Sequence, residues 1–280
     1  MRRTAEEDEN MTDRERLKAV FPDTKERCRT DPRLAERLRS CFYESCCIEA
    51  PGEDPAPLGL RPAQTQTLFT SALHPLAEAR TLSEVAAPSR VAVVNVPGSG
   101  SLWKPCAAHA WLMVCTTYMR VMRIAKLADV WYPRAVLGRG SPVSRLFVWT
   151  PGITVFKTLE DRPQPLEESK WLQIDVLTAM PPVLPEEAEG AEIEAPSETA
   201  VQAVRRSVTG WWRSVLRACH GQGGQMVVLP ALTPCKNPYA VAAFEACKDA
   251  LSDLELSFDK LVCSLWQGDG DQHLRETHRF

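Results

Sequence analysis

The sequence lacks a long apolar run, and it lacks a large excess of charge of either sign. No stretch approaches the roughly 18 to 20 uninterrupted apolar residues that span a bilayer. The first ten residues are polar and contain no apolar signal core. A formal net charge of −3 provides no general attraction to nucleic acid or to an anionic membrane. We therefore expect an intracellular protein, cytoplasmic or nuclear, that binds neither membrane nor nucleic acid.

Acidic residues are scarce in the middle of the chain, where Asp129 is the only carboxylate between Glu84 and Glu160. Within this stretch, Val91 to Asn95 forms an apolar run short enough for a buried strand. A turn rich in proline and glycine follows, and a helix is predicted to begin near Cys106. Backbone N–H groups at the start of such a helix converge on one point, which suits a phosphate. The pattern predicts a phosphate-type loop without a carboxylic acid or base beside it.

The remaining composition is that of a globular protein. The 280 residues are 44% hydrophobic and 25% charged, which is typical of one sizeable core or at most two domains. Ten cysteines are present, but no Cys-x-x-Cys pair or nearby histidine accompanies Cys41, Cys46 and Cys47. We interpret the cysteines as mostly buried thiols, and we expect neither a metal nor a cofactor.

Helices are predicted at the N-terminal end of the domain. Residues 1–12 are polar and are predicted to form a flexible arm. Thr12 and Glu15 have the spacing of a capping box, and Asp31 followed by Pro32 is a second helix start. We therefore expect a helical extension over residues 13–50.

Beyond the extension, short apolar runs alternate with longer amphipathic segments. Strands are predicted over residues 91–95, 146–148, 153–156, 172–177, 226–229 and 261–266. Helices are predicted over 106–127, 199–219 and 238–254. Apolar strands separated by helices are typical of an α/β fold with a mixed sheet and helices on both of its faces.

One domain is predicted over residues 13–267, followed by a polar tail over 268–280. Within the domain, the segment from Met180 to Thr199 holds six glutamates and neither lysine nor arginine. Such a segment cannot bury enough apolar area to become ordered. We therefore expect an acidic loop insertion over 183–198, either simply solvated or in contact with a partner.

A second loop resembles the first in its position between a strand and a helix. It follows the predicted strand 226–229 and precedes the helix at Pro238. Ligands bind beyond the carboxyl ends of strands in open α/β sheets, and the pairing of two such loops favours a binding site more than either loop alone. The candidate ligand-binding residues are Asn95, Pro97, Gly98, Ser99, Gly100, Ser101, Leu232, Thr233, Cys235 and Asn237.

The order of these segments resembles the microbial-type poly(ADP-ribose) glycohydrolases, a branch of the macrodomain superfamily. Residues 93–95 and 97–100 are similar to the two ends of that family's first loop. Further similar segments are 149–157, 174–182, 205–221, 227–231 and 232–238. The resemblance implies a macrodomain-like mixed sheet flanked by helices on both faces, with an N-terminal helical extension.

The resemblance also implies a mechanism. In the family, two loops hold the diphosphate of ADP-ribose, and a glutamate on the helix after the first loop protonates the leaving oxygen between two riboses. The positions matching the family's Gln-Glu-Glu are Ala108, His109 and Ala110. A methyl group cannot donate a proton, so His109 is the remaining candidate acid. The alternative for His109 is a partly exposed helix residue without a chemical role.

Both loops depart from the family pattern. Ser99 stands in place of a central glycine, Pro234 removes an N–H donor, and Cys235 replaces an aromatic residue that could stack on adenine. These departures predict weakened anion binding at both loops.

Three hypotheses follow for the function. The first is a degenerate macrodomain without glycohydrolase activity that retains binding of ADP-ribose, a related nucleotide or an ADP-ribosylated protein. The second is a structural or protein-interaction module without nucleotide binding, with the acidic segment and Trp211-Trp212 as possible contacts for a protein partner. The third is an active glycohydrolase that uses a non-standard acid.

Overall fold

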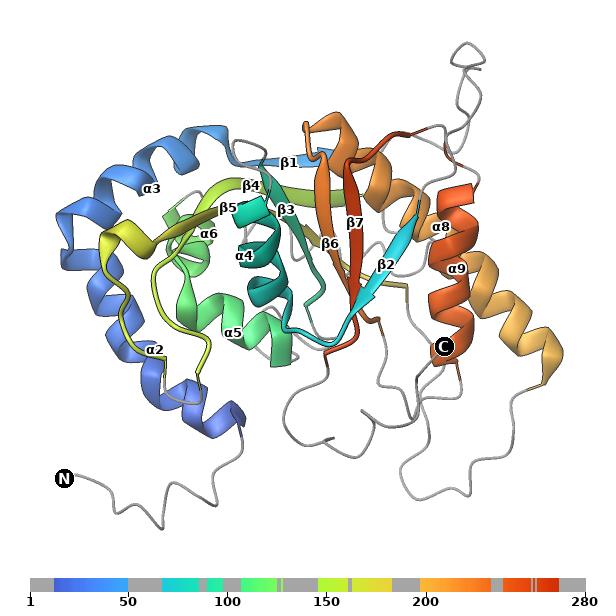
Figure 1. Cartoon of the computed structure of the whole chain (residues 1–280), viewed down its shortest axis with the longest axis horizontal. Coiled ribbons are helices and arrows are strands. Elements are labelled where there is room, and N and C mark those ends of the chain that lie inside the picture. The colour runs from blue at the N-terminus through green and yellow to red at the C-terminus, as the bar shows by residue number, and fades with distance from the viewer. Residues whose placement is uncertain are drawn as a thin grey trace.

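The computed structural model describes residues 13–49, 67–85, 90–97, 107–124, 127, 146–160, 163–182, 197–232, 239–252, 254 and 256–266. A seven-stranded sheet lies at the centre, with helices on both faces (Figure 1). This arrangement confirms the predicted α/β fold class. No helix in the described ranges is both long and apolar enough to cross a membrane.

The strands are β1 (Cys46–Glu49), β2 (Leu68–Ser71), β3 (Val91–Asn95), β4 (Leu146–Val155), β5 (Leu172–Ala179), β6 (Met226–Pro230) and β7 (Lys260–Ser264). The helices are α2 (Asp13–Thr30), α3 (Pro32–Glu44), α4 (Pro75–Val85), α5 (Ala107–Cys115), α6 (Tyr118–Ile124), α8 (Glu198–Gly221) and α9 (Ala240–Ser252), with a short 3₁₀ helix η2 (Glu168–Lys170).

The sheet is mixed, as predicted. Its strand order is β1-β4-β5-β3-β6-β7-β2. The strands from β5 to β2 in this order pair in parallel, whereas β4 and β1 pair antiparallel at the other end. Every residue of β3 and β6 is buried, which is why these strands are continuous apolar runs in the sequence.

Two hydrophobic layers cover the two faces of the sheet. One layer packs α4, α5 and α6 against it, and the other packs α8 and α9. Trp211 and Trp212 both lie inside the α8 layer, with exposed fractions of 0% and 2%. The prediction that this pair makes a surface contact is therefore wrong, because successive residues of a helix can both be buried where two helices and a sheet meet.

Most cysteines in the described ranges are buried free thiols, as predicted. The buried ones are Cys28, Cys41, Cys115, Cys219, Cys247 and Cys263, and Cys46 and Cys47 are half-buried. Burial raises the pKa of the Cys28 and Cys41 thiols to about 12. Such thiols remain protonated at neutral pH and are unreactive.

The helix predicted over residues 106–127 is wrong in its length, because it is broken into α5 and α6. The break is at Thr116, which forms a bridge with Val155 of β4. The main chain of Phe156 also donates to the carbonyl of Cys115 at 3.0 Å. Backbone groups of Cys115 and Thr116 therefore bond to the end of β4 and to Phe156, and they are not available for a continuous helix.

The strands predicted over 146–148 and 153–156 are instead one strand, β4, with an irregularity between Thr150 and Ile153. Gly152 has a φ of +69° there, a conformation that glycine adopts at little cost. Its N–H donates to the Asp175 carboxylate at 2.9 Å, and Arg90 donates to the same oxygen at 2.8 Å. Burial raises the pKa of Asp175, although these two donors oppose the rise.

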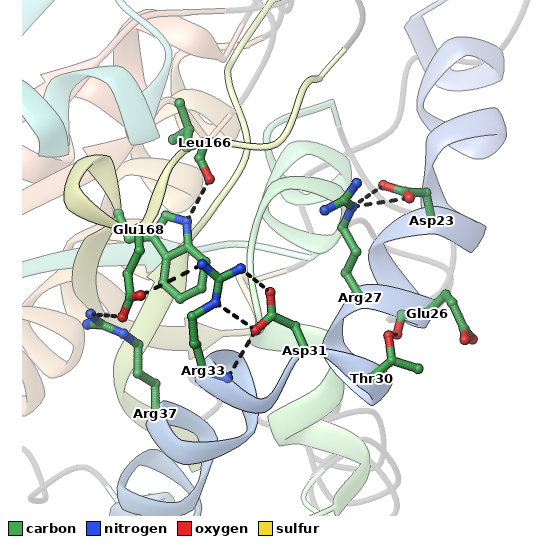
Figure 2. Close-up of polar contacts among 10 residues, drawn as sticks. Asp23, Glu26, Arg27, Thr30, Asp31, Arg33, Arg37, Leu166 and Glu168 are labelled. Atoms are coloured by element: carbon green, nitrogen blue, oxygen red, sulfur yellow. Dashed lines mark hydrogen bonds and ion pairs between the residues drawn. The ribbon is translucent and has the colours of Figure 1, made fainter.

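Helices α2 and α3 begin the described chain, and Asp31 caps α3 by accepting from the backbone N–H of Arg33. Figure 2 shows Arg33 and Arg37 of α3 reaching Glu168 of η2, at 3.8 and 3.4 Å. Both guanidinium groups also lie over the ring of Trp171, at 5.4 and 5.3 Å from its centre. These contacts fasten α3 to the connection between β4 and β5.

A buried lysine joins α2 to the rest of the domain. The side chain of Lys157, just after β4, has an exposed fraction of 0%. Its Nζ donates to Thr24 Oγ1 at 2.7 Å and pairs with Asp23 at 2.8 Å. The Thr24 hydroxyl in turn donates to the carbonyl of Val114 in α5. A single chain of polar contacts therefore connects β4, α2 and α5.

We predict that Asp23→Ala lowers the free energy of unfolding by about 3 kcal/mol, because the buried ammonium of Lys157 would lose its counter-ion. Glu26→Ala is the matched control on the same helix. Glu26 pairs with Arg29 at 2.7 Å in an exposed position, so its loss should lower the free energy of unfolding far less than the loss of Asp23 does. Urea unfolding measures both variants.

The stabilisation that Asp23 provides should depend on pH. Burial raises the pKa of Asp23, but Lys157 and Arg27 outweigh it, so the pKa lies below its ordinary value. The stabilisation is therefore present above the ordinary pKa of aspartate and is lost as pH falls through the lowered pKa of the folded state. Equal losses for the two variants at neutral pH would contradict this role for Lys157.

Candidate functional site

The two predicted loops leave the sheet from neighbouring strands. Strand β3 pairs in parallel with β6, with Val93 opposite Val228. By this register the carboxyl ends of the two strands, Asn95 and Pro230, lie at the same level. The first loop follows Asn95, and the second follows Pro230. The edge of the sheet formed by these two ends is the candidate site.

Asn95 is held by side chains of the interior. It is 5% exposed, and its Nδ2 donates to Thr178 Oγ1 at 3.2 Å and to the Tyr118 hydroxyl at 3.4 Å. The hydroxyls of Tyr118 and Thr178 are 2.7 Å apart and share a hydrogen bond. Asn95 therefore anchors the start of the first loop, and its predicted contact with a ligand stays a prediction.

The other predicted ligand-binding residues are only partly within the described ranges. Pro97 is buried directly after β3, and Leu232 is half-buried against the layer of α8 and α9. The remaining predicted residues lie outside the described ranges: Gly98, Ser99, Gly100, Ser101, Thr233, Cys235 and Asn237. Their role in binding stays a prediction.

Helix α5 follows the first loop, where the family resemblance places the catalytic helix. Positions 108, 109 and 110 lie in its first turns. The described backbone therefore places His109 on α5, although its side chain is outside the described part. The sequence of α5, AAHAWLMVC, contains no carboxylate.

A buried carboxylate that no sequence pattern marks lies at the same edge, beyond β6 and β7. Glu78 of α4 is 7% exposed and accepts a hydrogen bond from the Ser71 hydroxyl, at the end of β2, at 2.8 Å. The Ser264 hydroxyl, at the end of β7, donates to the carbonyl of Leu73 at 2.7 Å. The sequence prediction missed this group because it assigned neither β2 nor α4. These contacts connect the edge strand β2 to α4 and strand β7 to the segment between β2 and α4.

A histidine also lies at this edge. His74 accepts a hydrogen bond from the backbone N–H of Leu76 at its Nδ1, at 3.1 Å, which leaves the proton on Nε2. Its ring lies edge-on to Trp266 at 4.5 Å and to Trp111 of α5 at 5.7 Å. Burial lowers the pKa of His74 to about 3. His74 is therefore neutral at physiological pH and contributes no positive charge for a phosphate.

A metal-binding role finds no support in the described ranges. No group of three or more His, Cys, Asp or Glu side chains there could hold a metal ion. The described side chains at the edge are hydroxyl and amide groups, the neutral ring of His74 and the carboxylate of Glu78.

Comparison with known proteins gives matches at the level of structure alone. No protein-family model and no curated protein matches this sequence. Among solved structures, the poly(ADP-ribose) glycohydrolase of Thermomonospora curvata bound to the inhibitor ADP-HPD superposes with a TM-score of 0.61 at 18% identity, over 90% of this chain and 93% of that chain. The poly(ADP-ribose) glycohydrolase of Deinococcus radiodurans in complex with ADP-ribose gives 0.59 at 15% identity, over 84% and 92%.

These identities are low, whereas the coverage of both chains is high, so the likeness concerns the fold. This likeness confirms the fold that was predicted from the resemblance of the sequence segments to the family. The chain has the fold of the bacterial poly(ADP-ribose) glycohydrolases.

Proposed function

We propose that this chain is a macrodomain that binds ADP-ribose or a related nucleotide and does not hydrolyse poly(ADP-ribose). One observation carries the proposal. The two loop-bearing strands end side by side, as a nucleotide site of this fold requires, while the helix after the first loop holds Ala108, His109 and Ala110 in place of acids. The proposed protein thus keeps the strands that position a binding site but lacks the acids that cleavage needs.

Binding is supported by the placement of the loops and of the helices that follow them. Helix α5 begins after the first loop and α9 begins after the second. Helix N-termini attract anions because their first N–H groups are unpaired and the helix dipole is positive there. Two helix ends of this kind, each following one of two adjacent strands in sequence, would suit the two phosphates of a diphosphate. The neighbours in structure include glycohydrolases bound to ADP-ribose and to ADP-HPD.

Inactivity is supported by the positions of the nearest described carboxylates. Cleavage between two riboses needs an acid that protonates the leaving oxygen. Glu78 is buried and accepts from Ser71. Asp175 lies three residues before Thr178 on β5, about 10 Å further from the edge. It is bonded to Gly152 and Arg90. Glu78 lies at the end of β2, two strands beyond β6, and Asp175 lies inside the sheet, so neither takes the place of an acid on α5.

We predict that ADP-ribose binds in calorimetric titration with one site and a dissociation constant on the order of 0.1 mM, weakened by the departures in both loops. Leu232→Glu should weaken binding about tenfold, because a carboxylate at the start of the second loop repels the diphosphate. Tyr43→Glu is the control, since Tyr43 is 82% exposed and lies on α3 just before β1, which is three strands away from β3 in the sheet. It should leave the affinity unchanged.

Silence of the wild-type protein at millimolar ADP-ribose would refute the binding proposal. It would favour a structural or protein-interaction module instead. Equal weakening by both variants would show that the ligand binds elsewhere.

We predict that poly(ADP-ribose) incubated with the protein releases ADP-ribose no faster than in buffer, because no carboxylic acid follows the first loop. His109→Ala should behave as the wild type does. Release at an enzyme-like rate that is lost in His109→Ala would overturn the prediction and establish His109 as a non-standard acid. Chromatography of the soluble products measures the release.

A further inference from the structure

Three buried side chains lie beneath the start of the first loop and join three elements. Asn95 ends β3, Thr178 lies opposite it on β5, and Tyr118 begins α6. The Asn95 amide donates to both hydroxyls, at 3.2 and 3.4 Å, and the hydroxyls bond to each other at 2.7 Å. We call this group the Asn95 cluster.

The cluster connects strand β3, which precedes the first loop, with helix α6, which follows α5. The loop leaves β3 at Asn95 and enters α5, which ends at Cys115. Tyr118 follows only three residues later, and its hydroxyl returns to the Asn95 amide. The chain therefore runs from β3 through the loop and α5, and the hydrogen bonds of Tyr118 close it into a ring.

The position of Tyr118 is fixed independently of the loop. The backbone N–H of Thr117 donates to the carbonyl of Thr154, and the backbone N–H of Thr154 donates to the Thr117 hydroxyl, each at 3.0 Å. The Thr116 hydroxyl accepts from the N–H of Tyr118 at 3.0 Å. Strand β4 thereby holds the junction of α5 and α6, and the Tyr118 ring extends from a fixed base.

We propose that Tyr118 is a positioning residue whose hydroxyl, together with Thr178, fixes the Asn95 amide and so fixes the residue at which the first loop leaves β3. This role rests on the proposed binding of ADP-ribose at that loop. It assigns to the site a residue that touches no ligand and that acts through Asn95.

The chemistry of the cluster suits a permanent structural contact. Tyr118 is 0% exposed, and burial raises its pKa well above the ordinary value, so the hydroxyl keeps its proton. It can then share a proton with Thr178 while it accepts from Asn95. All three side chains are uncharged, and a buried amide left without its partners is costly. The cluster should therefore hold one arrangement across the physiological pH range.

The first test reads the Asn95 amide directly and needs no ligand. The chain has three asparagines, Asn10, Asn95 and Asn237, so selective ¹⁵N-asparagine labelling gives three side-chain amide signals, and Asn95→Asp identifies the one of interest. Tyr118→Phe removes only the hydroxyl. We expect it to shift the Asn95 signal while the Asn10 signal stays in place. An unmoved Asn95 signal would overturn the proposal.

The second test reads affinity for ADP-ribose. Tyr118→Phe and Thr178→Val should each weaken binding about fivefold, whereas Thr178→Ser, which keeps the hydroxyl, should retain the wild-type affinity. Thr209→Val is the matched control. It removes a buried hydroxyl that donates to the carbonyl of Arg205 in α8, and it should not change the affinity even if it lowers the melting temperature.

The two tests separate the two claims. If wild-type protein binds no ADP-ribose, the proposed function fails, and the Asn95 signal alone decides whether Tyr118 positions Asn95. If wild-type protein binds and Tyr118→Phe binds equally well, the positioning role is refuted. The positioning role is supported if Tyr118→Phe shifts the Asn95 signal and weakens binding while Thr178→Ser keeps the wild-type affinity.

Discussion

The parallel pairing of β3 with β6 is the constraint on which the candidate site depends. Because Val93 lies opposite Val228, both strands end at the same level, and the two loops start from neighbouring strand ends. Both strands are fully buried between the two helical layers, which fixes their place at the centre of the sheet. Slippage of one strand would break the hydrogen bonds of this pairing and displace the start of one loop relative to the other. The stability of the sheet and the geometry of the site therefore have the same origin.

Two carboxylates near the candidate site have structural partners. Glu78 accepts from Ser71 at the end of β2. Asp175 lies about 10 Å below the edge on β5 and accepts from Gly152 and Arg90. Under the proposed function, neither carboxylate takes the place of an acid on α5. Anion binding does not require such an acid, because recognition at helix ends relies on main-chain groups.

Much of the sheet could be predicted from the sequence, because central parallel strands are continuous apolar runs bounded by turn residues, and β3 and β6 are of this kind. The edge strands could not. Strand β2 has four residues, none fully buried, so it carries no such signal. The break between α5 and α6 also escaped prediction, because the hydrogen bonds of β4 impose it and local propensity does not. The partners of Asn95 are 23 and 83 residues away in sequence, and no local spacing reveals them.

Long-range contacts of this kind also hold the elements before and after the first loop. Strand β4 holds the junction of α5 and α6 through Thr117, and Thr178 holds Asn95 at the end of β3. The Tyr118 hydroxyl joins these two parts, so displacement of either part would break buried hydrogen bonds. Under our proposal, a substitution at Tyr118 or Thr178 therefore acts on the site through Asn95, without any change in the sequence of the loop.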